Sequence, residues 1–465
     1  MLCSAHPVNS RILSLHPVPV IDALARPVAS TLDNCLVPFC RAPQQFLLDR
    51  ARTHGPVALY RLDEEIFASV SDPEIVHAVF HGSMDDFEKG PIIDVVRVIF
   101  GYGLFSADGQ EWIDQQKAIA PMFARHRIRR LVETIAGLAD EQVVRWQQRG
   151  DHEDDGALIA LKRLAFDVVA VTLFSLHDET QRAALFDGLY QLERLPMVSS
   201  TYIGRRMPFD RLSAIVSSGE GSAAARVTRT NELFYAIVDE RLASAEQADD
   251  VIGAVLASPA IGALPLERRR VLLRDVIASL LTAGYVSTGE TMFWTLYHLA
   301  GHPDVQARAR EEILAASAPL ADAPPYLAAV INETMRLYPP AWYIGRTTLR
   351  PMQLGGVDIP VGTQVVCSPF VLHRSPALWT DPDVFSPERF LPGSTIVPRS
   401  FIPFGTGTRS CLGRAMSLIE TTSLVSATLR AFDLELASGP SSVTLTGTYS
   451  MQPRERISIR LRPRS

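Results

Sequence analysis

Residues 404–413 read Phe404-Gly405-Thr406-Gly407-Thr408-Arg409-Ser410-Cys411-Leu412-Gly413, and a helix-compatible run begins at Arg414. A cysteine just before a helix faces unpaired backbone N–H groups and the positive end of the helix dipole, so its thiolate is stabilised. Gly405 and Gly407 permit positive φ, which lets the backbone curl around the sulfur of Cys411. Gly413 has no side chain that would hold the helix away from a large flat ligand. A thiolate presented in this way is one of the known ligands of haem iron.

The alternative for Cys411 is a buried, inert thiol, which is the usual state of a single cysteine among glycines. Arg409, two residues upstream, is a permanent cation suited to an anionic group on the same ligand. The other motifs of the chain decide between these two interpretations.

The bulk composition is that of a folded protein with a sizeable core. The 465 residues include 47% hydrophobic and 21% charged residues, and the formal net charge of -6 argues against nucleic acid as the main partner. Cysteines are scattered along the chain, at Cys3, Cys35, Cys40, Cys367 and Cys411. This scatter indicates a reduced, cytoplasmic protein rather than a disulfide framework.

The N-terminal region has the composition of neither a membrane span nor a signal peptide. Pro, His, Arg and Asp interrupt it every few residues up to Pro38, whereas a span needs about 20 consecutive apolar residues. We therefore expect a soluble protein without a membrane anchor, with an irregular arm over residues 1–45 and a single domain over residues 46–465.

The first half of the domain begins with strands and continues as helices. Residues 57–62 and 66–70 have the pattern of a β-hairpin. Residues 110–183 are amphipathic and helical, interrupted by an acidic turn at 151–156. Residues 197–222 carry the weakest pattern for regular structure and are typical of a long loop.

A helix expected over residues 275–300 is apolar on nearly all faces, which indicates burial within the protein. Asp275 and Glu290 bracket fourteen uncharged residues, too few to span a bilayer. Small and hydroxyl-bearing residues gather at its middle, namely Thr282, Ala283, Gly284, Ser287, Thr288 and Gly289. Such a cluster either opens space for a water or ligand or merely permits close packing of a neighbouring helix.

A charged pair lies in the next long helix, which is expected over residues 326–337. Glu333 and Arg336 are spaced i, i+3 and therefore share one helix face. If the helix is buried, this pair needs further partners to offset desolvation, and Arg389 in the later segment 385–390 is the candidate.

These separated motifs, in this order, resemble those of the cytochrome P450 family from about Val57 to the end of the chain. The resemblance implies a mainly α fold with a smaller β region and a haem b (iron protoporphyrin IX) between the helix around Gly284 and the helix after Cys411. In the family pattern Cys411 is the iron ligand, and Glu333, Arg336 and Arg389 form a structural triad. The remaining positions that match haem contacts are Arg346, Arg409, Trp112, Phe404, Gly405 and Gly413.

The chain departs from the family pattern at two places. Gln116 stands where the family has an arginine for a haem propionate, with Lys117 next to it. On the distal helix, Val286 replaces the acidic residue and Ser287 replaces the first threonine. Because O₂ activation consumes protons, the residues expected to carry them are Ser287, Thr288 and Glu290. For Glu290 the alternative is a solvated or paired carboxylate without this role.

The leading functional hypothesis is a haem-thiolate monooxygenase that oxidises a hydrophobic small molecule with O₂. The missing acid at Val286 counts against this hypothesis. Electrons would come from NAD(P)H through a ferredoxin or flavodoxin and its reductase. A basic segment of the chain could receive such an acidic partner or could be a solvated helix face, and it comprises Lys117, Arg125, Arg127, Arg129 and Arg130.

Two alternatives stay open at this point. Val286 favours an enzyme that uses peroxide or rearranges an already oxidised substrate. A non-catalytic haem sensor is the third reading. The protein is expected to be a bacterial monomer of specialised metabolism, and the residues expected to line its substrate pocket are Phe100, Ala283, Trp342, Tyr343 and Tyr449, with core packing as the alternative for each.

Overall fold

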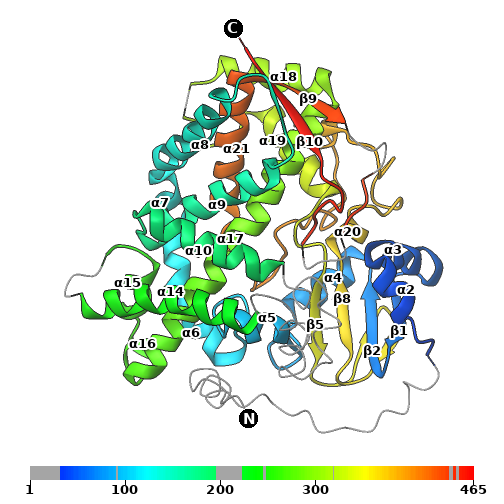
Figure 1. Ribbon diagram of the computed structural model, residues 1–465. Coiled ribbons are helices and arrows are strands. Elements are labelled where there is room, and N and C mark those ends of the chain that lie inside the picture. Colours follow the sequence, from blue (N-terminus) through cyan, green and yellow to red (C-terminus); the bar gives the residue numbers. More distant parts are fainter. Residues whose placement is uncertain are drawn as a thin grey trace, which may run out of the picture.

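The computed structural model describes residues 32–90, 93–194, 223–244, 248–317, 319–438, 443–446 and 450–464. The stretch 197–222, expected to be a long loop, and the pocket candidate Tyr449 lie outside the described residues. Within them the protein has a large helical part and a smaller sheet region, which lie on opposite sides in Figure 1.

The helical part is built around α17, which runs from Leu266 to Gly301 without a break in its helical assignment. Most residues of α17 are buried against other helices, which explains why apolar residues occur on nearly all of its faces. Of the described residues, only this helix is long and apolar enough to cross a membrane by length and composition. Figure 1 shows it passing through the centre of the helical part.

The helices before α17 form the walls around it. They are α5 (Asp94–Phe100), α6 (Gly109–Ile119), α7 (Arg125–Arg130), α8 (Val132–Gln147), α9 (Ala157–Phe174), α10 (Glu179–Glu193), α14 (Ala223–Ala243), α15 (Val251–Ala257) and α16 (Pro259–Gly262), with a 3₁₀ turn at Ala120–Phe123. Side-chain caps begin three of them: Asp108 at α6, Asp178 at α10 and Asp250 at α15.

The helices after α17 are α18 (Pro303–Ala315), α19 (Pro325–Leu337), α20 (Pro369–Leu372) and α21 (Arg414–Ala431), with a 3₁₀ turn at Pro387–Phe390. Proline at the first position of α18, α19 and α20 supplies a preset φ where the missing N–H costs no hydrogen bond. The helix α21 follows directly on the cysteine loop, as the sequence predicts.

The sheet region holds five strands in the order β1-β2-β8-β5-β3. The strands are β1 (Val57–Leu62), β2 (Glu65–Val70), β3 (Phe87–Glu88), β5 (Ile344–Thr348) and β8 (Gln364–Cys367). The predicted hairpin is confirmed, since Val57 pairs with Val70 and Leu62 with Glu65 in antiparallel register. Strand β8 then adds to β2 in parallel, and α4 (Pro73–His81) packs on the sheet.

Two smaller sheets complete the fold. The hairpin of β6 (Met352–Leu354) and β7 (Val357–Ile359) turns through Gly355 and Gly356, both at positive φ. The other sheet has the order β4-β10-β9, with β4 at His152–Asp154, β9 at Phe432–Ser438 and β10 at Ser458–Pro463.

The N-terminal boundary differs from the expectation of an irregular arm up to residue 45. Residues 36–41 form α2 (Leu36–Arg41) and residues 43–54 form α3 (Pro43–His54). Helix α3 buries Leu47 and Leu48 in the same apolar cluster as Tyr60 and Phe67 of the sheet. The mixed, Pro-interrupted sequence hides these helices because tertiary burial stabilises them more than local propensity does.

Candidate active site

The cysteine loop turns through two glycines in the left-handed region, with φ of 67° at Gly405 and 77° at Gly407, as the sequence predicts. A Cβ on Gly407 would lie 2.2 Å from the carbonyl oxygen of Phe80, so only glycine fits there. The backbone N–H of Cys411 donates to the carbonyl of Phe404 over 2.9 Å and closes the loop. This geometry holds the cysteine just ahead of α21.

Cys411 is exposed as a residue, but its sulfur is largely surrounded by protein atoms. That partial desolvation raises the pKa of Cys411, while the backbone N–H groups of Gly413 and Arg414 lower it. The N–H groups therefore act as the sequence predicts, but they do not outweigh desolvation. A bound metal cation would supply the remaining stabilisation of the thiolate.

A basic cluster adjoins this loop. Arg409 forms an ion pair with Asp108 and stacks its guanidinium over Trp112 at 4.9 Å. Burial, together with the nearby charge of Arg409, lowers the pKa of Arg346 to about 10. The structure thus brings together three residues that the sequence singled out from separate segments: Arg409, Trp112 and Arg346.

Two further cations belong to the cluster and were missed by the sequence reasoning. Burial lowers the pKa of Lys89 well below its usual range, and the charges of Arg409, Arg346 and Arg97 add to that effect. Asp108 is the acidic member, and hydrogen bonds from the Lys89 N–H and from Arg409 lower its pKa despite the opposing effect of burial. Asp108 carries one signal in the sequence, because it precedes the helix that holds Trp112.

The cluster of Lys89, Arg97, Arg346, Arg409 and Asp108 sets four basic side chains against one carboxylate. Nη1 of Arg409 is buried and has no hydrogen-bond partner among the described residues. A buried, unpaired guanidinium nitrogen in a basic cluster fits an anionic ligand. A soft sulfur donor next to a site for two carboxylates is the donor set that haem requires.

Gln116 lies half-buried on α6, and Lys117 beside it is exposed. Lys117 thus stands on the surface, whereas Lys89 and Arg97 belong to the basic cluster. Lys89 and Arg97 therefore supply positive charge to the cluster, whereas position 116, where the family has an arginine, carries an uncharged glutamine.

On the distal side, an exposed stripe interrupts the buried middle of α17. Ala283 is exposed, and Leu280, Gly284 and Ser287 are half-buried, at helical spacing along one face. The Ser287 hydroxyl donates to the carbonyl of Ala283 over 2.8 Å. At Gly284 an added Cβ would lie 2.7 Å from Cγ2 of Val169 on α9, so close packing explains this glycine.

The three residues expected to carry protons lie in different places. Ser287 lies on the exposed stripe of α17. Thr288 is buried and donates to Oγ of Ser417 on α21 over 3.1 Å, which joins the two helices that bracket the site. Glu290 is fully buried, and Lys162 and Ser450 bind its carboxylate.

The residues expected to line the substrate pocket also lie in different parts of the fold. Ala283 is on the exposed stripe, and Phe100 is buried in the core that surrounds α17. Trp342 belongs to the apolar cluster beneath the sheet, with the half-buried Tyr343 against it at 5.6 Å between ring centroids. Trp342 is therefore a core residue in its surroundings, which is the alternative that the sequence left open for it.

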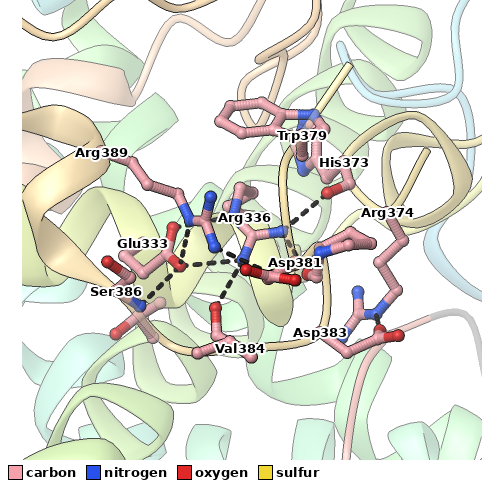
Figure 2. A network of polar contacts seen from close by, with 12 residues as sticks. Glu333, Arg336, His373, Arg374, Trp379, Asp381, Asp383, Val384, Ser386 and Arg389 are labelled. Carbon is pink, nitrogen blue, oxygen red and sulfur yellow. Dashed lines mark hydrogen bonds and ion pairs between the residues drawn. The ribbon is translucent and has the colours of Figure 1, made fainter. Parts of the chain in front are cut away.

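The side chains of the structural triad, Glu333, Arg336 and Arg389, lie together in one polar network, as Figure 2 shows. Arg336 binds both carboxylate oxygens of Glu333, with distances of 2.7 and 2.8 Å, and both side chains are fully buried. Nε of Arg389 lies 3.3 Å from Oε1 of Glu333, and the backbone N–H of Ser386 donates to the same Oε1 over 2.9 Å. These additional donors offset the cost of burying the pair.

The remaining hydrogen bonds of Arg336 go to backbone carbonyls. It donates to those of His373, Pro382 and Val384, over 2.8, 2.6 and 3.1 Å. Every terminal nitrogen of the guanidinium is thus used, so the side chain fixes several loops at once (Figure 2).

A surface groove of about 600 Å³ lies beside the cysteine loop. Leu412, Arg414 and Ala415 of the loop and α21 line one side of it, and residues of α7 and α19 line the other. Two exposed arginines of α7, Arg125 and Arg129, both pair with Asp322. Part of the predicted basic segment is therefore neutralised within the chain, as is Arg127 by Asp249.

The sequence matches the family described as Cytochrome P450 over residues 35–460. Cyclooctatin synthase of Streptomyces melanosporofaciens is 28% identical over 434 residues, which cover 91% of this chain and 88% of that protein. Carotene epsilon-monooxygenase, chloroplastic, of Arabidopsis thaliana is 27% identical and covers 85% of this chain and 77% of its own length.

Solved structures with the same fold are cytochromes P450. The crystal structure of a cytochrome P450 (CYP102L1) superposes with a TM-score of 0.76 at 23% identity, over 91% of this chain and 95% of that one. The heme domain of cytochrome P450DA superposes with a TM-score of 0.75 at 22% identity, over 91% and 92% of the two chains.

Proposed function

This chain belongs to the cytochrome P450 family of monooxygenases, and from that premise we propose that it oxidises an apolar small molecule with O₂ and electrons from a separate redox protein. The observation that carries the proposal is the pairing of a free thiol, Cys411, with a buried basic cluster around Arg409. The first suits iron and the second suits the propionates of haem b.

Haem, when bound, supplies the activation of O₂ by iron. Cys411 would hold the iron, and the backbone N–H groups of Gly413 and Arg414 would stabilise the negative charge on its sulfur by hydrogen bonds. Arg346, Arg409, Lys89 and Arg97 would hold the propionates. Phe404, whose ring lies 5.6 Å from the Arg414 guanidinium, would shield the sulfur from solvent.

Proton delivery would depend on Ser287. Its hydroxyl lies on the exposed stripe of α17, where it can hold a water molecule while it donates to the Ala283 carbonyl. Val286 is buried and apolar and cannot relay a proton. Slow O₂ chemistry, or a proton supplied by the substrate itself, is compatible with this arrangement.

The substrate would be a hydrophobic compound of the terpenoid, polyketide or lipid type. The exposed stripe offers Leu280 and Ala283, which are apolar, beside a single hydroxyl from Ser287. One relative is named for carotene, an apolar compound, which favours the terpenoid class for this chain.

The electron donor would be an acidic ferredoxin or flavodoxin with its reductase, reduced in turn by NAD(P)H. The groove beside the cysteine loop presents Arg125, Arg129 and Arg414 to such a partner. The described cysteines, Cys35, Cys40, Cys367 and Cys411, form no disulfide with each other, which supports a reducing, cytoplasmic setting.

The test is a carbon-monoxide difference spectrum of the reduced, haem-loaded protein, followed by turnover with NAD(P)H and surrogate redox partners. We expect the Soret band of a thiolate-ligated ferrous haem, and its loss in Cys411→Ser. An unchanged spectrum in Cys411→Ser would refute the thiolate assignment. Turnover that requires NAD(P)H and O₂ would support the monooxygenase proposal.

Val286 favours a second candidate function, the use of peroxide in place of O₂ and electrons. Peroxide already carries the two electrons and two protons that O₂ would have to receive, so it depends less on an acid at position 286 to deliver protons. Product formation with hydrogen peroxide alone, together with none from NAD(P)H, O₂ and redox partners, would favour this candidate over the first.

A further inference from the structure

A charged cluster is buried on the side of α17 that faces α9. Nζ of Lys162 forms an ion pair with Glu193 at the end of α10, and it lies 3.3 Å from Oε1 of Glu290 on α17. All three side chains are almost completely shielded from solvent. Removing one partner of a buried ion pair leaves an uncompensated buried charge, so each member of the cluster constrains the elements that carry the others.

The two carboxylates also bind a segment far along the chain, residues 450–452. Ser450 donates through Oγ to Oε1 of Glu290 over 2.8 Å, and the Met451 N–H donates to Oε2 over 3.2 Å. Nε2 of Gln452 donates to Oε1 of Glu193 over 2.6 Å. The segment is therefore held by both acids.

Two more hydrogen bonds connect the end of α10 and residues 450–452 to α17. The Tyr285 hydroxyl donates to Oε2 of Glu193 over 2.9 Å, and Nε1 of Trp294 donates to the carbonyl of Met451 over 2.9 Å. The end of α10 and residues 450–452 are thus both attached to the helix that carries Ala283 and Ser287 on its exposed stripe.

The charges of the cluster do not balance when all its members are ionised. Two carboxylates then face one ammonium. Burial raises the pKa of Glu290 to about 7, which Lys162 opposes and Glu193 reinforces. Burial alone would lower the pKa of Lys162, but the two carboxylates raise it, so the lysine keeps its charge.

We propose that Lys162, Glu193 and Glu290 are positioning residues that hold the end of α10 and residues 450–452 against α17, and that loss of one proton from the cluster loosens them and weakens binding of bulky substrates. The proposal rests on the proposed function, because the segments that the cluster holds are bonded to α17, the helix that carries the exposed stripe. The groups that face Glu290 are Lys162 from α9, Glu193 from α10, and Ser450 and Met451 from the C-terminal segment.

The test compares two ligands that bind haem iron through an unprotonated nitrogen, bulky clotrimazole and small imidazole, in the haem-loaded protein between pH 6 and 8. Each Kd is calculated for the unprotonated ligand, because imidazole itself titrates in this range. In the wild type we expect the ratio of the clotrimazole Kd to the imidazole Kd to rise about threefold or more as the pH increases, in the range of a coupling between neighbouring groups. Glu290→Gln mimics the protonated acid, so its ratio should stay at the wild-type value of pH 6.

Lys162→Met gives the opposite result, because it leaves two buried carboxylates without their cation. We expect a raised ratio at every pH, and partial recovery in the double variant Lys162→Met with Glu290→Gln. Packing alone would make the two changes additive, whereas the charge cluster predicts that the second change rescues the first. Arg270→Gln, which breaks an exposed pair with Asp239, serves as the control and should behave like the wild type.

Amide hydrogen exchange of Met451 supplies a readout that does not need haem. After correction for the intrinsic pH dependence, exchange should be faster at pH 8 than at pH 6 in the wild type and equal at both in Glu290→Gln. A wild-type ratio and exchange rate that do not change with pH, or a Glu290→Gln variant that keeps the wild-type slope, would overturn the proposal. A missing carbon-monoxide Soret band would instead refute the proposed function and leave the exchange result to decide this one.

Discussion

The backbone N–H of Ile402 donates to Nε2 of His373 over 2.9 Å, in a fully buried contact. The carbonyl of the same histidine accepts a hydrogen bond from Arg336 of the triad. His373 therefore connects the triad to the cysteine loop, whose first residue, Phe404, lies two positions after Ile402. Burial lowers the pKa of His373 to about 3, with Arg336 adding to the effect, so the ring stays neutral and accepts this bond.

Replacing His373 by leucine should leave the Ile402 N–H buried without a partner. We expect the holoprotein to lose about 1–3 kcal/mol of unfolding free energy and to release haem faster. Urea unfolding and transfer of haem to apomyoglobin measure the two effects.

His298 is the matched control, because it is also buried and its ring nitrogens have no hydrogen-bond partner among the described residues. It stacks on Phe385 at 4.0 Å instead. His298→Leu should therefore release haem at nearly the wild-type rate, and equal haem loss in the two variants would contradict the role given to His373.

The pH dependence of stability should carry the signature of His373. An ordinary histidine has a pKa of about 6.5. Since the fold lowers the pKa of His373 to about 3, its contribution is complete above about pH 6.5 and is lost as the pH falls toward 3. Urea midpoints between pH 7 and pH 4 should fall less steeply in His373→Leu than in the wild type.

The motifs that local geometry controls were predictable from sequence. Gly405 and Gly407 take the positive φ expected of them, because only glycine adopts it without strain. Glu333 and Arg336 meet because an i, i+3 spacing places them on one helix face. Arg389 reaches the same carboxylate, although that contact required the family pattern to be foreseen.

Contacts between distant segments were not predictable in this way. Lys89 and Asp108 approach Arg409 only after the chain has folded, and no local pattern marks Lys89. Glu290 was expected near Ser287, but Lys162 on α9 and the segment at Ser450 bind its buried carboxylate. The direction of a helix face depends on what packs against it, and that is a property of the whole fold.

Lys89 should contribute to haem retention. Its ammonium donates to the carbonyls of Leu104 and Phe105, over 3.0 and 2.8 Å, and belongs to the basic cluster. We expect Lys89→Met to lose haem about tenfold faster in the apomyoglobin assay, whereas Lys117→Met, at an exposed lysine, should not change the rate. Equal rates for both variants would show that Lys89 does not act on the propionates.

Ser287 should control how efficiently O₂ consumption yields product. Ser287→Ala removes the hydroxyl on the exposed stripe, so product per NAD(P)H should fall about tenfold to a hundredfold while hydrogen peroxide rises. Ser287→Thr keeps the hydroxyl and should retain most of the yield. The carbon-monoxide spectrum should be the same in both, and a Ser287→Ala variant with normal yield would exclude the residue from proton delivery.

Asp322 should slow association with an acidic electron donor. Its carboxylate forms ion pairs with Arg125 and Arg129, and so reduces the positive charge that these arginines offer to the donor. We expect Asp322→Asn to raise the rate of reduction by a surrogate ferredoxin about two- to fivefold at low ionic strength. The gain should vanish at about 0.5 M salt, where such charges are screened. Arg129→Gln should lower the rate, and a faster reaction in that variant would contradict docking at this groove.

The helix crossing at Gly289 leaves no room for a side chain, since an added Cβ would lie 2.7 Å from Cα of Lys162. Any larger residue at position 289 must push α9 away, and Lys162 moves with it. The steric fit at Gly289 and the ionic balance around Lys162 are therefore coupled at this crossing. A mutational library aimed at new substrates would do well to leave position 289 constant and to vary the exposed stripe instead.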